Sequence, residues 1–218
     1  MSNTREAILN QVRAALGNRS VDAASVRSAA QALLADPAAT RPAPGAGSLA
    51  DRFIEKVTSP RVAATVTRLS AMAEVPAAVS DYLQARGLPR SIALQPNEAL
   101  RALDWSTFEV HEKVAAKEPV AVGIARWGIA ETGSLVFHSG PDLAVLGNFL
   151  PLHHLVVLPC DKLLAYLDDY ADLVAGQPMP RNLNLITGAS GTTDIEGSLV
   201  LGAHGPRYLH VLVVQAHA

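Results

Sequence analysis

The run HLVVLP, residues 154–159, is one of five short apolar stretches in the second half of the chain. The other four are PVAVGIA (119–125), SLVFH (134–138), LNLIT (183–187) and LHVLVV (209–214). All five are rich in β-branched residues and nearly continuous, whereas a half-buried strand alternates apolar and polar residues. Continuous apolar strands are typical of parallel sheets that are covered on both faces. The pattern predicts an α/β fold with a mostly parallel sheet and covering helices.

A helix is expected between two of these strands, after residue 160. Asp161 is placed to cap it, and Gly176, Pro178 and Pro180 are placed to end it. Its apolar stripe consists of Leu163, Leu164, Leu167, Tyr170, Ala171 and Val174. The order strand, helix, strand favours a right-handed crossover.

The first 47 residues have a different character. Residues 3–16 have the apolar spacing of an amphipathic helix, residues 22–35 suit a second helix, and residues 35–47 form an Ala/Pro/Gly-rich linker. We therefore predict N-terminal helices with a linker over 1–47 and an α/β domain over 48–218. The helices either pack loosely on the body or on a partner, or form a solvated tail with one docked face.

The segment between residue 48 and the first apolar run also carries recognisable elements. Helices are expected at 49–58, 74–86 and 97–103, strands at 62–69 and 91–94, and the segment 108–114 is ambiguous.

Composition narrows the classes of function. The chain of 218 residues has 18 basic and 20 acidic residues, a net charge of −2 and no Lys/Arg run, which disfavours a nucleic-acid-binding surface. Its one cysteine, Cys160, excludes an internal disulfide and a four-cysteine iron–sulfur cluster made by this chain alone. The N-terminus lacks the apolar core of a secretory signal, and polar residues interrupt the apolar tract 143–160. We expect a cytoplasmic protein without a membrane span.

Three loops carry the chemistry, and the first is IAETGSLVFHSGP, residues 129–141. Glu131, Thr132, Gly133 and Ser134 precede an apolar strand, and Ser139 follows it. Small hydroxyl residues beside glycine expose backbone N–H groups and add hydroxyl donors, so the loop suits a carboxylate or phosphate. Ordinary turn chemistry is the alternative.

The second loop is ITGASGTTDIEGS, residues 186–198, which places Gly188, Ser190 and Thr193 before two carboxylates. It matches neither the Walker pattern nor GxGxxG. If the segment is extended, Asp194 and Glu196 share a face and raise each other's pKa. If it is helical, Asp194 is a first-turn cap.

The third loop, GAHGPRYLHVLVV at 202–214, sets His204 beside glycines at a strand entrance, where an imidazole can act as a general acid or base. A structural histidine is the alternative. Arg207 pairs either with a carboxylate ligand or with a surface acid. His153 and His154 point to opposite faces of a strand, so no metal site is predicted.

Together these segments resemble the LUD domain of the lactate-utilisation protein C family. The family shows an IAETG segment, an SGP-like turn, a Pro-x-His strand and a DIE…G-x-HGP signature, and their order and spacing match over about 119–214. The matching residues here are 129–134, 139–141, 151–153, 188–196 and 202–206.

The resemblance implies a three-layer α/β/α sandwich similar to the sugar-phosphate isomerase and CoA-transferase superfamily. It also implies a part in the oxidation of L-lactate to pyruvate beside two iron–sulfur partner subunits, with no cofactor in this chain. The sequence departs from the family at Ala189, which replaces a proline, and at Asp142, near which members often carry an arginine. Arg207 and Arg126 are available to replace that arginine.

Our leading hypothesis is a subunit of a lactate-oxidising complex whose three loops line one pocket. In it Glu196, His204 and Glu131 are the catalytic candidates. The candidates for binding a small carboxylate or phosphorylated ligand are Thr132, Gly133, Ser134, Ser139, Gly188, Ser190, Thr193, Asp194, Gly205 and Arg207. The alternatives are a stand-alone enzyme in which Glu131 or Glu196 acts on a sugar phosphate or acyl-CoA, and a non-catalytic assembly protein whose N-terminal helices recruit partner subunits.

Overall fold

The structure is a computed structural model that describes residues 2–17, 22–193 and 199–215. It divides into two units, Met1–Ala43 and Pro44–Ala218. The first unit contains the helices α1 (Ser2–Ala15) and α2 (Ala23–Ala35), followed by a 3-10 turn at Pro37–Thr40. Asp22 caps α2 by accepting a hydrogen bond from the Ser25 amide at 3.2 Å. Both helices predicted here are therefore present.

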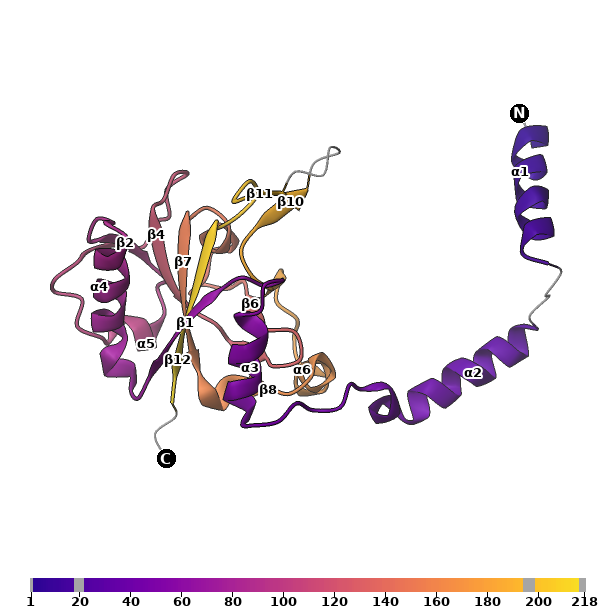
Figure 1. Cartoon of the computed structure of the whole chain (residues 1–218), viewed down its shortest axis with the longest axis horizontal. Helices are drawn as coiled ribbons and strands as arrows, with labels where there is room; N and C mark the ends of the chain where they lie inside the picture. Colours follow the sequence, from indigo (N-terminus) through magenta and orange to yellow (C-terminus); the bar gives the residue numbers. More distant parts are fainter. Residues whose placement is uncertain (1, 18–21, 194–198, 216–218) are drawn as a thin grey trace. The chain divides into compact units, whose positions relative to one another are not determined.

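A six-stranded parallel sheet forms the centre of the second unit (Figure 1). Its strand order is β1-β12-β7-β4-β2-β3, and every neighbouring pair is parallel. The strands are β1 (Thr65–Leu69), β2 (Ser91–Leu94), β3 (Glu109–His111), β4 (Val120–Ile124), β7 (His153–Pro159) and β12 (Tyr208–Val214). The predicted parallel sheet is confirmed, and the ambiguous segment 108–114 contributes its edge strand β3.

Both faces of this sheet are covered, which explains the continuous apolar runs. Helices α4 (Val75–Ala85) and α5 (Glu98–Arg101) pack on the face that carries Leu155 and Val157 of β7. Helix α3 (Leu49–Val57) packs on the other face, against Val156 and Leu158. Residues 153–158 of β7 are thus all buried, because each points to one of two covered faces. The fold is α/β with helices on both sides of a mostly parallel sheet, as predicted.

A second sheet of four strands shares the face of α3. It has the order β8-β5-β6-β9, with β5–β6 and β6–β9 antiparallel and β5–β8 parallel. The strands are β5 (Trp127–Ile129), β6 (Ser134–His138), β8 (Leu163–Leu164) and β9 (Leu183–Ile186). A separate antiparallel pair joins β10 (Gly191–Thr193) to β11 (Leu199–Leu201).

The second sheet corrects two predictions. The helix expected from residue 163 begins later, as α6 (Leu167–Val174), because Leu163 and Leu164 form β8. The expected crossover is also absent among the described residues, since β7 and β9 lie in different sheets. The strand at 134–138 looked parallel because Leu135 and Phe137 enter one core while Val136 enters another. Burial on both faces makes a run continuous whatever the direction of its neighbours.

Short 3-10 turns complete the second unit at Met72–Glu74, Val145–Asn148 and Cys160–Lys162. Among the residues that the structure describes, no helix has the length and apolar character needed to cross a bilayer.

Candidate functional site

Two adjoining hollows lie along β2, β4 and β7 and reach the carboxyl ends of these strands. The inner hollow has a volume of about 160 Å³ and the outer about 280 Å³, and Gln95 and Leu143 line both. In open parallel sheets, ligands bind outside the carboxyl ends of the strands. This position makes the pair of hollows, called here the carboxyl-edge cleft, the candidate site.

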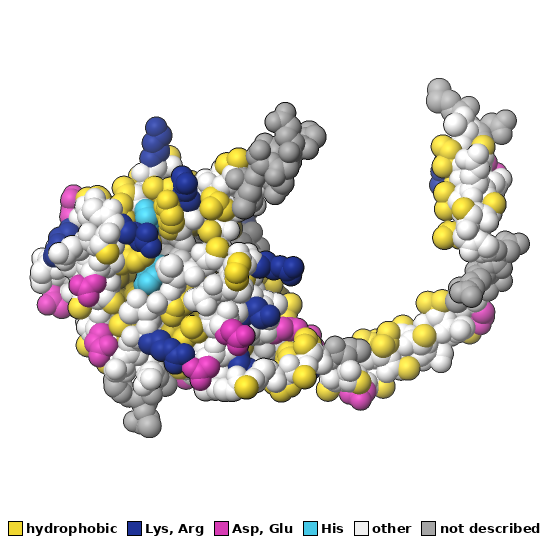
Figure 2. Space-filling view, in the orientation of Figure 1, with side chains coloured by type: hydrophobic (Ala, Val, Ile, Leu, Met, Phe, Trp, Pro, Cys, Tyr) yellow, Lys and Arg dark blue, Asp and Glu magenta, His cyan; other side chains and the backbone are white. Residues whose placement is uncertain are grey.

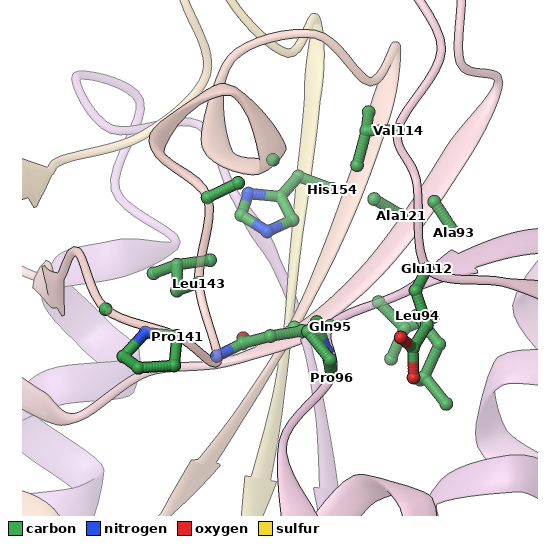
Figure 3. A pocket seen from close by; sticks show the side chains of 15 residues that line it. Ala93, Leu94, Gln95, Pro96, Glu112, Val114, Ala121, Pro141, Leu143 and His154 are labelled. Carbon is green, nitrogen blue, oxygen red and sulfur yellow. The ribbon is translucent and has the colours of Figure 1, made fainter.

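The inner hollow is mostly apolar, and its principal polar side chains are those of His154 and Gln95 (Figure 3). His154 points into it from β7, and Gln95 follows directly after β2. Glu112 also lines it, but its carboxylate is paired with Arg101. The apolar lining includes Ala93, Leu94, Ala121, Val122, Pro141 and Leu143.

His154 is the most unusual group in the cleft. Its side chain is 2% exposed, its ring stacks on Phe137 with centroids 5.8 Å apart, and its Nδ1 atom has no hydrogen-bond partner among the described residues. Burial lowers its pKa to about 4, so the ring is neutral at pH 7. A neutral imidazole has one donor and one acceptor, and leaving such a group unpaired costs about 1–3 kcal/mol. Nδ1 is thus a buried polar atom whose hydrogen bond no described residue satisfies.

Gln95 is held in place by the sheet. Its Oε1 accepts a hydrogen bond from the Ile124 amide at 2.8 Å. Gly123 lies between the two polar side chains: a Cβ atom there would be 3.0 Å from Gln95 Oε1 and 3.3 Å from His154 Nε2. Glycine at this position lets both side chains approach over β4.

The outer hollow is bordered by charged groups. Arg126, which follows β4, and Lys162 provide two cations, while Asp142 provides one carboxylate. The Arg126 guanidinium lies 5.5 Å from the ring centroid of Trp127, and Lys162 pairs with the exposed Asp161 at 3.1 Å. Arginine and lysine beside a cavity are the side chains that bind carboxylates and phosphates.

Two neighbours complete the outer hollow. Asn97 donates to Asp142 Oδ2 at 3.4 Å. His138 shares a 2.7 Å hydrogen bond with the hydroxyl of Tyr170, and burial together with the Arg126 charge lowers the His138 pKa. Both histidines of the cleft are thus biased towards the neutral state.

The residues of the first predicted loop lie in another hollow, of about 790 Å³, which Glu131 and Thr132 line with Lys56 and Arg61. Thr132 also belongs to a chain of three hydroxyl groups. Ser134 Oγ is 2.6 Å from Thr132 Oγ1 and 2.5 Å from Thr187 Oγ1.

Glycine at position 133 has a packing reason. Its φ is +71°, and a Cβ atom would be 2.9 Å from the backbone nitrogen of Val57. The IAETG segment therefore packs tightly against the end of α3.

The second and third predicted loops meet each other. The Ser190 amide donates to Pro206 O and the Gly202 amide to Ser190 O, both at 2.8 Å. His204 Nδ1 is 2.9 Å from Thr192 Oγ1, and His204 and Gly205 line a hollow of about 580 Å³.

The remaining predicted residues have separate surroundings. Gly188 packs against Val62, Ser139 accepts a hydrogen bond from the Asn182 amide at 2.9 Å, and the Arg207 guanidinium lies 5.6 Å from the Tyr208 ring. Thr193 ends β10, and its side chain, Asp194 and Glu196 lie outside the described residues.

Most described members of the predicted pocket therefore fall into two groups, one around Glu131 and one around His204, while Gly188, Ser139 and Arg207 have other neighbours. Their binding and catalytic roles stay predictions. The carboxyl-edge cleft was not predicted as a pocket. Among the described residues of the predicted loops, only those of the first loop reach it, through Phe137, His138, Gly140 and Pro141, with Asp142 directly after them. Gln95, His154 and Lys162 occur in no motif, and only their position at or near the ends of parallel strands could have indicated them.

The LUD domain family model matches residues 9–214. The chain belongs to the LUD domain family. This confirms the resemblance found in the three loops.

Curated relatives carry names from the same family. The chain is 29% identical over 118 residues to "Lactate utilization protein C" of Bacillus subtilis (strain 168), covering 51% of this chain and 49% of that protein. It is 30% identical over 121 residues to "Uncharacterized protein YkgG" of Escherichia coli (strain K12), covering 52% of each. The matched part spans about half the length of these relatives.

A solved structure supports the fold. A crystal structure of a DUF162 family protein from Deinococcus radiodurans has a TM-score of 0.53 to this chain at 22% identity. The match covers 78% of this chain and 99% of the other. At this identity the likeness concerns the fold alone.

Proposed function

We propose that the chain is a component of a lactate-utilisation system and works with iron–sulfur subunits in the oxidation of L-lactate to pyruvate. The observation that carries the proposal is the LUD family match over residues 9–214, together with relatives named for lactate utilisation. The oxidation removes two electrons and two protons from the hydroxy acid. The electrons would pass to clusters in the partner subunits, because one cysteine cannot supply the four thiolates that a cluster takes.

The cleft supports a role in handling the acid itself. Arg126 and Lys162 suit a carboxylate, and the neutral ring of His154, which lines the cleft, suits a hydroxyl group or its proton. In this proposal the chain binds and orients a small anion while the partner subunits accept electrons.

Growth on lactate tests the function. A strain that lacks the gene is expected to grow on glucose but not on L-lactate, and the wild-type gene is expected to restore growth. Normal growth of the deletion strain on L-lactate would contradict the proposal. Co-purification of the tagged chain with cysteine-rich proteins, recognised by the absorption of iron–sulfur clusters, tests the partners.

One observation favours a second role, in assembly. Helices α1 and α2 expose apolar side chains (Figure 2), including Ile8 at 56% and Leu34 at 76%. Exposed apolar helix faces are typical of surfaces that bind other proteins. If assembly is the whole function, deleting residues 1–43 abolishes growth on lactate while Arg126→Gln and His204→Ala leave it intact.

A further inference from the structure

The two halves of the carboxyl-edge cleft differ in chemistry. The outer hollow offers two cations, Arg126 and Lys162, against the single carboxylate of Asp142, which would repel an anion placed beside it. The inner hollow offers apolar walls, two uncharged polar side chains and the Glu112 carboxylate, which is paired with Arg101. A ligand that fills both must therefore be charged at one end and mostly apolar at the other.

The size of the inner hollow sets the size of the apolar end. A single water needs about 10–15 Å³ of cavity, so the 160 Å³ of the inner hollow holds several water-sized groups. The methyl group of lactate would fill a small part of this space. A tail of several non-hydrogen atoms would fill more of it.

The polar side chains set what lies between the two ends. Gln95 Oε1 already accepts a hydrogen bond from the Ile124 amide, so Gln95 offers a ligand its amide N–H groups. The neutral His154 ring lines the hollow and offers a donor or an acceptor. One donor and one group of either kind match a hydroxyl or carbonyl oxygen beside the charged end.

We infer that the carboxyl-edge cleft binds a hydroxy or oxo acid whose carbon tail is longer than that of lactate. The carboxylate lies in the outer hollow with Arg126 and Lys162, and the tail and the oxygen substituent lie in the inner hollow with His154 and Gln95. The inference rests on the proposed function only for the choice of a hydroxy acid as probe. The cavity and its charges are independent of that choice.

Calorimetric titration of the purified full-length chain tests the inference. The probes are 2-hydroxy-4-methylpentanoate, L-lactate, acetate and the uncharged 2-hydroxy-4-methylpentanamide. We expect the branched acid to bind at least about tenfold more tightly than acetate, lactate to fall between them, and the amide to bind no more tightly than acetate. Equal binding of all three acids, or no binding by any of them, overturns the inference.

Variants locate the binding. Arg126→Gln is expected to lower the affinity for the branched acid by about tenfold or more, since a charge-assisted contact is lost. Arg90→Gln is the matched control: Arg90 bonds to Ser80 and lies 5.9 Å from the Phe108 ring, outside both hollows. An equal loss in both variants overturns the assignment of the outer hollow.

A steric pair tests the inner hollow. Gly123→Ala adds a methyl group 3.0 Å from Gln95 Oε1, whereas Gly45→Ala adds one at an ordinary 3.6 Å from Arg52. Gly123→Ala is expected to weaken binding of the branched acid several-fold more than binding of acetate. Gly45→Ala is expected to leave the affinity for both acids unchanged. If Gly123→Ala melts early, His154→Leu replaces it, with the same expected preference. If a variant lowers the affinity for both acids equally, the carbon tail does not lie in the inner hollow.

These results separate the inference from the proposed function. If deletion of the gene leaves growth on lactate normal while the binding pattern appears, the function fails and the site stands. If growth is lost but the purified chain shows no preference for the longer acid, the site fails and the function stands.

Discussion

Two buried histidines that adjoin in the sequence have opposite surroundings. His153 points to the face of α4, where its Nδ1 is 3.0 Å from the Tyr82 hydroxyl and its ring stacks on Tyr208 with centroids 4.5 Å apart. His154 points to the other face, into the inner hollow, and its Nδ1 has no partner among the described residues. Buried polar groups are nearly always paired. The difference therefore separates a histidine whose Nδ1 is paired from one whose Nδ1 has no partner among the described residues.

A third histidine belongs with the first. His210 of β12 lies 2.7 Å from Thr65 Oγ1 and 3.2 Å from Thr67 Oγ1, and its ring centroid is 4.6 Å from that of Tyr82. The Arg86 guanidinium lies 4.4 Å from the Tyr82 ring. These contacts connect a set of residues called here the α4-face cluster: Thr65, Thr67, Tyr82, Arg86, His153 and His210. A connected polar network of this kind makes a core more rigid when every hydrogen-bonding group in it has a partner.

The largest expected effect is that of pH on stability. Burial lowers the pKa of both His154 and His210 from 6.5 to about 4, with the Arg86 charge adding to the shift of His210. Between these values the unfolded chain binds more protons than the folded one, so stability is full above pH 6.5 and falls as the pH drops towards 4. At pH 5 the loss is about 2 kcal/mol for each histidine, or about 4 kcal/mol together.

Urea unfolding at pH 7.5 and pH 5 measures this loss, and pH 5 lies above the usual range of exposed carboxylates. In His154→Leu the loss is expected to fall by about half. A wild-type protein equally stable at both pH values would show that neither histidine is held neutral.

The next effect concerns the α4-face cluster. His210→Ala leaves two threonine hydroxyls without their partner and opens a cavity beside Tyr82, which is expected to lower stability at pH 7.5 by about 3 kcal/mol. The shift of the urea midpoint at constant slope measures it. Thr187→Ala is the control, because it removes one hydrogen-bonded hydroxyl, the partner of Ser134 Oγ, from another part of the protein. It is expected to lower the free energy of unfolding by about 1 kcal/mol.

The difference between the histidines also shows how far the sequence can be interpreted. The apolar run at 153–159 predicts a strand buried on both faces, and the alternation of side chains predicts that His153 and His154 diverge. Which face is packed and which is hollow depends on segments far away in the chain, Val75–Ala85 and residues 140–147. No local pattern contains that information.

The same reason explains the predicted pocket. The three loops were identified from glycines and hydroxyls, yet Gly133 and Gly188 are glycines because they pack against the backbone of Val57 and Val62. Close backbone packing and anion binding select the same residue type. The cleft was missed for the opposite reason, since Gln95, Arg126 and Lys162 are ordinary residues brought together by three separate strand ends.

A smaller effect is expected for the hydroxyl of Tyr82. Tyr82→Phe keeps the ring, its stacking and its volume, but leaves His153 Nδ1 buried without a partner. We expect a loss of about 1–2 kcal/mol at pH 7.5. The nitrogen shifts of His153 in a ¹⁵N NMR spectrum should change with it. Unchanged stability would mean that the α4-face cluster is no better satisfied than His154.

The smallest expected change in stability is that of His154→Leu at pH 7.5. The substitution removes a buried polar atom that has no partner in the described part of the chain and places an apolar side chain against Phe137, so two opposing effects nearly cancel. We expect the free energy of unfolding to change by less than about 1 kcal/mol in either direction, while binding of the branched hydroxy acid weakens several-fold. A loss near that of His210→Ala would instead show that His154 is a packing residue, and the distinction between the two faces of β7 would disappear. Stability and binding must therefore be measured on the same preparation, because only their divergence identifies a side chain held in place for a ligand.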